Sequence, residues 1–182
     1  IRISGTHAYK IVNSISSNMP KKEGRVSFNK IYDKNKLTID QTLTTYFKAP
    51  KSFTGEDVVE ITTHGGSAVI KKILETLSSF KETQLADPGE FTRRAFENNK
   101  LDLTQVEAIA DVVDSETEMQ RKQAISHLSG DFFKQSKNVF ESLKKILADI
   151  EAVIDFSDED LPTNLMKKIK EQIENNILII NK

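Results

Sequence analysis

Glu60 is a carboxylate inside an apolar, strand-like run, and this position suits either of two roles. It lies between Val59 and Ile61 in residues 57–63, and alternation along a strand turns it away from both neighbours. It is then either an exposed strand carboxylate or a fixed acceptor for two adjacent N–H donors, such as the edge of an amidine-like ring. The sequence alone leaves both interpretations open.

Two cations have the chemistry to contact an anionic or carbonyl group of a ligand. Arg2 lies in a strand-like run at the start of the chain, and its guanidinium is either a surface charge or a forked donor to a carboxylate or carbonyl. Lys100 comes just after Asn98-Asn99, which we expect to end a short helix. It is either a solvated cation at that helix end or a positive contact for an anion.

Three further groups carry weaker signals. The His-Gly-Gly turn of residues 64–66 could bring backbone N–H groups to an anion at a helix start, although such glycines more often only make the turn. His64 is not expected to bind a metal, because it lacks partners at metal-ligand spacing. Arg93-Arg94 could touch phosphate, but we favour a solvated helix face. An acidic group could bind a divalent ion but lacks the glycine and spacing of a calcium loop, so we interpret it as an exposed connection between helices. Its members are Asp155, Asp158, Glu159 and Asp160.

The composition and the missing motifs exclude several classes of function. The 182 residues carry a formal net charge of -1, which gives no electrostatic case for direct nucleic-acid binding. The absence of cysteine excludes disulfides and thiolate metal sites and suits a reducing compartment. No apolar run is long enough to cross a bilayer, and no signal peptide is visible. No phosphate-loop motif is present, which excludes a standard GTPase or ATPase site within these residues.

The elements that must position these side chains change character along the chain. The first half mixes alternating runs with short helical runs, and residues 25–32 and 37–47 predict a hairpin. Residues 88–111 begin the helical half, with a short helix after Pro88-Gly89 and a capping box expected at residues 104–107. Beyond it we expect one long helix from Val106 through Leu128, followed by further helices.

Two stretches together resemble the signature of the MnmE (also TrmE) tRNA-modification GTPases. The first is SFTGEDVVE at residues 52–60, with His-Gly-Gly at residues 64–66. The second is PGEFTRRAF at residues 88–96, followed by KLDLTQ at residues 100–105. The order and spacing of these segments make the resemblance specific, and it spans essentially the whole chain.

The resemblance implies an α+β fold in two parts. Residues 1–99 would form a mixed-sheet domain that binds tetrahydrofolate and dimerises, related to the glycine-cleavage aminomethyltransferases. Residues 100–182 would form the first part of an all-α helical domain. In the family a GTPase domain is inserted within the helical domain, and this chain stops about where that insertion would begin. Both ends look cut, so we expect a fragment that is inactive as a GTPase by itself.

The resemblance also implies a function. Family members are cytoplasmic homodimers that work with the flavoprotein MnmG (GidA) to add a carboxymethylaminomethyl-type group to C5 of the wobble uridine of certain tRNAs. 5-Formyl-tetrahydrofolate or a related one-carbon tetrahydrofolate occupies the N-terminal domain, whereas GTP, Mg²⁺ and K⁺ belong to the GTPase domain. The tRNA would be reached through the complex, and no membrane is involved.

Carried over position by position, the family's folate contacts fall on Arg2, Glu60 and Lys100, with no catalytic and no metal-binding residue implied. The adjacent ring N–H and amino donors of a pterin match the carboxylate of Glu60. Arg2 and Lys100 can meet carbonyl or glutamyl carboxylate oxygens. Ser67 stands where the family usually has proline, which should alter turn stiffness rather than ligand contacts, because proline mainly fixes φ.

Two alternatives remain beside this binding module. One is a free-standing folate-dependent aminomethyltransferase, against which the long helices after Leu103 argue. The other is a purely structural interaction module whose ligand pocket is vestigial.

Overall fold

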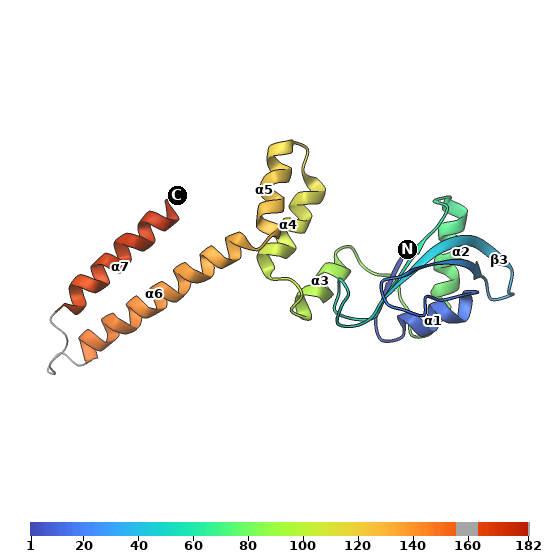
Figure 1. Ribbon diagram of the computed structural model, residues 1–182, viewed down its shortest axis with the longest axis horizontal. Helices are drawn as coiled ribbons and strands as arrows, with labels where there is room; N and C mark the ends of the chain where they lie inside the picture. The colour runs from blue at the N-terminus through green and yellow to red at the C-terminus, as the bar shows by residue number, and fades with distance from the viewer. Residues whose placement is uncertain (156–163, 182) are drawn as a thin grey trace. The chain divides into compact units, whose positions relative to one another are not determined.

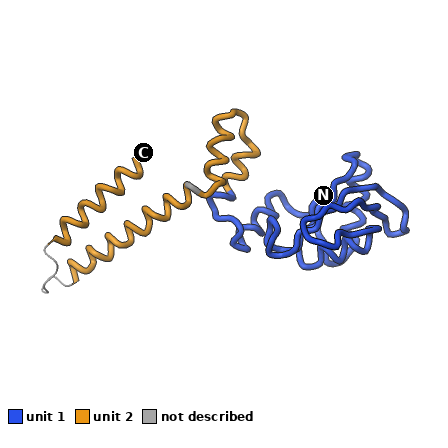
Figure 2. Tube along the Cα trace, in the orientation of Figure 1, with its two compact units in different colours: residues 1–106 blue, residues 107–182 orange. Residues whose placement is uncertain are grey.

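The computed structural model describes residues 1–155 and 164–181. The chain divides into two compact units, Ile1–Val106 and Glu107–Lys182 (Figure 2), and each unit is described by itself. The expected α+β class is confirmed by a sheet-containing first unit and a helical second unit (Figure 1). The acidic residues at 158–160 lie outside the described residues.

The first unit is built on an antiparallel sheet whose strands lie in the order β1-β4-β3-β2. The expected hairpin is confirmed, because β2 pairs with β3 around a turn in which the Asp33 carboxylate accepts the N–H groups of Asn35 and Leu37. The strands are β1 (Arg2–Ser4), β2 (Val26–Tyr32), β3 (Thr38–Phe47) and β4 (Val58–Thr62).

Two helices cover one face of this sheet. The helices α1 (Ala8–Ile15) and α2 (Ser67–Leu77) bury apolar side chains at helical spacing against Val59 and Ile61 of β4. Because successive side chains on a strand alternate between faces, Glu60 lies on the opposite face from α1 and α2. This alternation along β4 keeps Glu60 accessible while Val59 and Ile61 form part of the core.

The short helix α3 (Glu90–Glu97) begins and ends where the sequence predicts. Gly89 precedes it with φ of 79°, and Asn99 follows it with φ of 55°, so both ends use left-handed backbone. The N–H of Lys100 donates to the carbonyl of Ala95, and that of Asn99 to the carbonyl of Phe96, which together make a Schellman motif. This cap fixes the backbone of Lys100 relative to α3.

The expected helix from Val106 through Leu128 is wrong, because the structure breaks it in two. The helix α4 (Leu103–Asp114) ends, and α5 (Glu118–Leu128) begins after a capping box between Thr117 and Gln120. The Thr117 hydroxyl accepts the N–H of Gln120 at 3.2 Å, while the Gln120 side chain accepts the N–H of Thr117 at 2.9 Å. This cap satisfies backbone donors that a continuous helix would otherwise bond internally.

The capping box at the start of α4 is also shifted from its predicted place. The carboxylate of Asp102 accepts the N–H of Gln105 at 3.0 Å, and the Gln105 side chain accepts the N–H of Asp102 at 3.0 Å. Thr104 instead donates its hydroxyl to Asp102 at 2.6 Å. An aspartate is at least as good an N-cap as a threonine, so the cap lies two residues earlier than predicted.

The second unit continues with α6 (Asp131–Asp155) and α7 (Leu165–Ile180), which pack against each other. Asn176 of α7 is buried and donates its side-chain amide to the Ser142 hydroxyl of α6 at 2.9 Å. Among the described helices, none is both long and apolar enough to cross a membrane.

Candidate ligand-binding site

Arg2 and Glu60 meet on the sheet face opposite α1 and α2. They are paired residues of the antiparallel strands β1 and β4, and Nε and Nη2 of Arg2 lie 2.8 and 2.7 Å from Oε1 of Glu60. Their side chains are 39% and 38% exposed. Both contacts use Oε1, and Oε2 of Glu60 makes no hydrogen bond or ion pair with any described residue. A half-exposed carboxylate with one free oxygen can accept further N–H donors.

Two aromatic rings lie beside this ion pair. The guanidinium carbon of Arg2 is 5.2 Å from the ring centroid of Phe53 and 5.6 Å from that of Phe91. Cation–π attraction to both rings restrains the guanidinium. Phe53 comes from the loop of residues 48–57 between β3 and β4, and Phe91 from the first turn of α3. Apolar ring surface next to a few fixed polar groups is the usual lining of a small-molecule site.

Lys100 is positioned by the same loop. Its Nζ donates to the carbonyl of Pro50 at 3.0 Å, and Gly55 packs against its stem. A Cβ added to Gly55 would lie 3.2 Å from Cγ of Lys100, and the φ of 79° at Gly55 suits glycine. The loop therefore contacts Lys100 through Pro50 and Gly55, and it contacts Arg2 through Phe53.

The structure brings two of the three predicted folate contacts together and links the third through the loop. No hydrogen bond or ion pair among the described residues joins Lys100 to Arg2 or Glu60. A cavity of about 650 Å³ opens beside β1 and is lined by Arg2, Glu56, Glu90, Phe91 and Arg94, among others, but not by Glu60 or Lys100. Arg2 and Lys100 thus contact the same loop, Glu60 is joined to it only through Arg2, and the three residues do not line one cavity.

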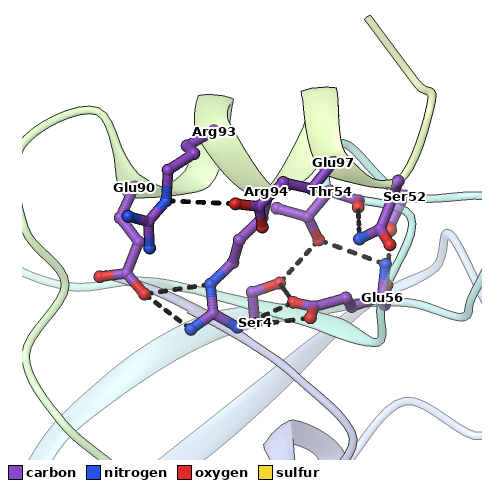
Figure 3. A network of polar contacts seen from close by, with 9 residues as sticks. Ser4, Ser52, Thr54, Glu56, Glu90, Arg93, Arg94 and Glu97 are labelled. Carbon is purple, nitrogen blue, oxygen red and sulfur yellow. Dashed lines mark hydrogen bonds and ion pairs between the residues drawn. The ribbon is translucent and has the colours of Figure 1, made fainter.

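Arg94 of α3 lies between two carboxylates (Figure 3). Its Nε and Nη2 donate to Oε1 of Glu90 at 3.0 and 2.6 Å, and its Nη1 lies 3.3 and 3.2 Å from the two oxygens of Glu56. The Arg94 side chain is 30% exposed, so the expected solvated face is wrong for this residue. It is right for Arg93, which is 69% exposed and contacts Glu97 at 3.6 Å.

Hydrogen bonds of Glu56 and Thr54 extend these contacts to β1 and to the C-terminal cap of α3. Ser4 donates its hydroxyl to Glu56 at 2.8 Å and lies 2.6 Å from the hydroxyl of Thr54. Asn98 donates its side-chain amide to the carbonyl of Thr54 at 2.8 Å. We call the connected set the Arg94 network. Its members are Ser4, Thr54, Glu56, Glu90, Arg94 and Asn98.

The ion pairs of the Arg94 network shift the pKa values of Glu90 and Arg94. The hydrogen bonds from Arg94, and then the backbone N–H of Asp87, hold the pKa of Glu90 below its usual range. The hydrogen bond to Glu90 in turn raises the pKa of Arg94 above its ordinary value, with Glu56 adding to the effect. Two carboxylates on one guanidinium leave the cluster with a negative charge in excess, which disfavours phosphate there.

Comparison with known proteins covers almost the whole chain. A family model described as GTP-binding protein TrmE N-terminus matches residues 1–100, and one described as MnmE helical domain matches residues 103–182. The chain belongs to the MnmE family. This outcome confirms the resemblance that residues 52–60 and 88–96 carry.

Several curated MnmE relatives, each named tRNA modification GTPase MnmE, share this region. The relative from Dinoroseobacter shibae is 41% identical over 171 residues, covering 94% of this chain and 40% of the relative. That from Wolbachia of Brugia malayi is 46% identical over 176 residues, covering 96% and 39%. That from Ehrlichia chaffeensis is 51% identical over 159 residues, covering 87% and 36%. The chain thus spans about 40% of the length of the MnmE relatives that it matches.

The two MnmE motifs meet in the structure through the Arg94 network. Thr54 and Glu56 belong to the first motif, and Glu90 and Arg94 to the second. Sequence reasoning assigned no site role to Thr54, Glu56 or Glu90, and it placed Arg94 on a solvated helix face. The i,i+4 spacing of Glu90 and Arg94 was a signal for a helical ion pair. Nothing local could have paired Glu56 with Arg94, because 38 positions separate them.

The His-Gly-Gly turn of the MnmE motif makes contacts that favour its structural interpretation. The ring Nδ1 of His64 is 2.8 Å from Asp40, and its backbone N–H donates to Asp40 at 2.9 Å. Burial raises the pKa of Asp40, but the hydrogen bonds from His64 and Gln41 outweigh it and leave that pKa below the usual range. A carboxylate at this turn disfavours a bound anion. Within the described residues, no group of three potential metal ligands occurs.

Proposed function

We propose that this chain is the folate-binding and dimerisation part of a MnmE-type protein. In this proposal residues 1–99 bind a tetrahydrofolate, and residues 100–182 begin the helical domain. The observation that carries the proposal is the pairing of Arg2 with Glu60 across β1 and β4, which leaves Oε2 of Glu60 free. The loop of residues 48–57 supports it, because this one loop contacts both Arg2 and Lys100.

Each side chain then has a defined binding role. The free oxygen of Glu60, together with the remaining capacity of Oε1, accepts the ring N–H and amino groups of the pterin. Arg2 holds the carboxylate of Glu60 in place, and its unused N–H donors face a carbonyl or carboxylate of the ligand. Lys100 exchanges its bond to the Pro50 carbonyl for a ligand oxygen, which carries a stronger charge-assisted hydrogen bond. The ligand class is a one-carbon tetrahydrofolate such as 5-formyl-tetrahydrofolate.

For the whole protein we propose the activity of the family. That activity is GTP-dependent addition of a carboxymethylaminomethyl-type group to C5 of the wobble uridine of tRNAs, together with the flavoprotein MnmG, in the cytoplasm. GTP, Mg²⁺ and K⁺ would act in the GTPase domain, and the tRNA would be a partner of the complex. The support is 41% to 51% identity to relatives named tRNA modification GTPase MnmE.

The proposed homodimer has support in the exposed side of the sheet. Val26, Phe28 and Leu43 are 61%, 61% and 48% exposed, and Phe28 lies opposite Leu43 in the β2–β3 register. Exposed apolar clusters on a sheet face commonly mark protein contacts. Sedimentation equilibrium of the chain is expected to give a dimer, and a strictly monomeric chain at micromolar concentration would remove this part of the proposal.

Isothermal calorimetry with 5-formyl-tetrahydrofolate tests the ligand assignment. The chain is expected to bind, and Glu60→Gln is expected to weaken binding by about tenfold or more, because a charge-assisted acceptor is lost. The matched control is Glu75→Gln, an exposed glutamate of α2 in the same unit, which is expected to bind like the wild type. A folded, dimeric chain that ignores every reduced folate would favour a purely structural module instead.

A further inference from the structure

We infer that Arg94 is a positioning residue that sets the distance between the Arg2–Glu60 pair and Lys100. The inference rests on the proposed function, because it concerns the same folate site. In the described part of the chain, Arg94 makes no hydrogen bond or ion pair with Arg2, Glu60 or Lys100, so it acts only through the residues that it holds.

Arg94 connects three separate segments of the first unit. It belongs to α3, which ends at Glu97 and whose Schellman cap fixes the backbone of Lys100. Through Glu56 it holds the end of the loop of residues 48–57, and through the same carboxylate it reaches Ser4 of β1. One guanidinium therefore ties the loop and β1 to the helix whose C-terminal cap holds the backbone of Lys100.

The loop transmits this restraint to both ends of the proposed site. Phe53 lies against the guanidinium of Arg2 on one side of Thr54, and Gly55 lies against the stem of Lys100 on the other. The hydroxyl of Thr54 contacts Ser4, and its carbonyl accepts the amide of Asn98. Since the Arg94 network fixes Thr54 and Glu56, it also fixes the two loop residues that touch the proposed ligand contacts.

The surroundings of Arg94 exclude a direct anion-binding role in this state. Its Nε and Nη2 are used by Glu90, and its Nη1 faces Glu56. The Glu90 side chain is only 8% exposed, so this ion pair is largely shielded from water. Shielded, multiply bonded guanidinium–carboxylate contacts hold geometry better than exposed single ones.

Calorimetry with 5-formyl-tetrahydrofolate on three variants tests the inference. Arg94→Gln is expected to weaken binding by about tenfold, with partial recovery in Arg94→Lys, because lysine keeps the charge but not the fork. Arg93→Gln is the matched control, since it removes the same charge one residue away on the exposed face of α3. Arg94→Gln that binds as tightly as Arg93→Gln would overturn the inference.

A double-mutant cycle separates positioning from general damage. If Arg94 acts through Lys100, Arg94→Gln is expected to have little further effect in a Lys100→Ala background. Additive losses of affinity would mean that Arg94 supports the fold without positioning the site residues.

Amide exchange of the ligand-free chain supplies a readout independent of folate. Arg94→Gln, unlike Arg93→Gln, is expected to speed amide exchange in both residues 52–57 and 98–101. If the wild-type chain does not bind folate, the proposed function and this inference are both wrong, whatever the amide-exchange rates show.

Discussion

Asn98 donates its side-chain amide to the backbone carbonyl of Thr54 at 2.8 Å, and this bond joins the end of α3 to the loop before β4. Asn98→Ala is expected to lower the free energy of unfolding of the first unit by about 1 kcal/mol, because the carbonyl loses its donor. All three tyrosines of the chain lie in this unit, so tyrosine fluorescence during urea unfolding measures it selectively. Asn13→Ala, on the exposed side of α1, is the control and should cause no loss.

Gly55 and Gly24 form a natural pair for testing how closely the loop approaches Lys100. Both have left-handed φ, of 79° and 70°, but an added Cβ meets Lys100 and Asn98 only at Gly55. Gly55→Ala is therefore expected to cost at least about 1 kcal/mol more than Gly24→Ala in urea unfolding. Only Gly55→Ala should also weaken folate binding. Equal costs for the two variants would show that the loop adjusts freely around Lys100.

The Glu90–Arg94 ion pair predicts a specific loss of stability in acid. The folded pKa of Glu90 is lowered by Arg94, so the unfolded state binds the proton more tightly. The contribution is fully present above the unfolded glutamate pKa of about 4.3 and is lost as the pH falls through the lower folded value. Arg94→Gln is expected to flatten this part of the pH profile of unfolding, measured by tyrosine fluorescence. An unchanged slope would contradict the assignment.

Thr117 is expected to be responsible for the break between α4 and α5. Thr117→Ala removes the N-cap and should destabilise the first turn of α5 by about 1 kcal/mol, which is about fivefold faster amide exchange there. Thr117→Ser should keep the cap. Ser126→Ala, an exposed position within the same helix, is the control. Protection in α5 that is indifferent to Thr117 would show that packing rather than capping sets the boundary.

The sequence predicted the elements whose signals are local. The hairpin of β2 and β3, the buried alternation around Glu60, and the left-handed Asn99 all follow from residue periodicity or turn chemistry. The interruption at residues 115–117 was missed because apolar spacing continues on both sides of it, although Thr117 and Gln120 form a recognisable capping pair. Giving the Thr117–Gln120 capping pair more weight than the apolar periodicity would have placed the boundary between α4 and α5 correctly.

The candidate site was only partly predictable for a different reason. Arg2, Glu60 and Lys100 were named through the family resemblance, and strand register then made two of them neighbours. The Arg94 network is non-local, since its members come from β1, a loop and α3. Residue periodicity does not indicate such contacts, so the amphipathic pattern of the helix alone placed the Arg94 side chain on a solvated face.

The register of β1 on β4 has a consequence for folding as well as for binding. Sliding β1 by one residue would turn Arg2 toward the helix-covered face and Ile3 toward water. The mispaired chain would then carry an unneutralised cation into the core and leave Glu60 alone. The Arg2–Glu60 ion pair therefore favours the native strand alignment, because it forms at the surface only when β1 and β4 are in the correct register.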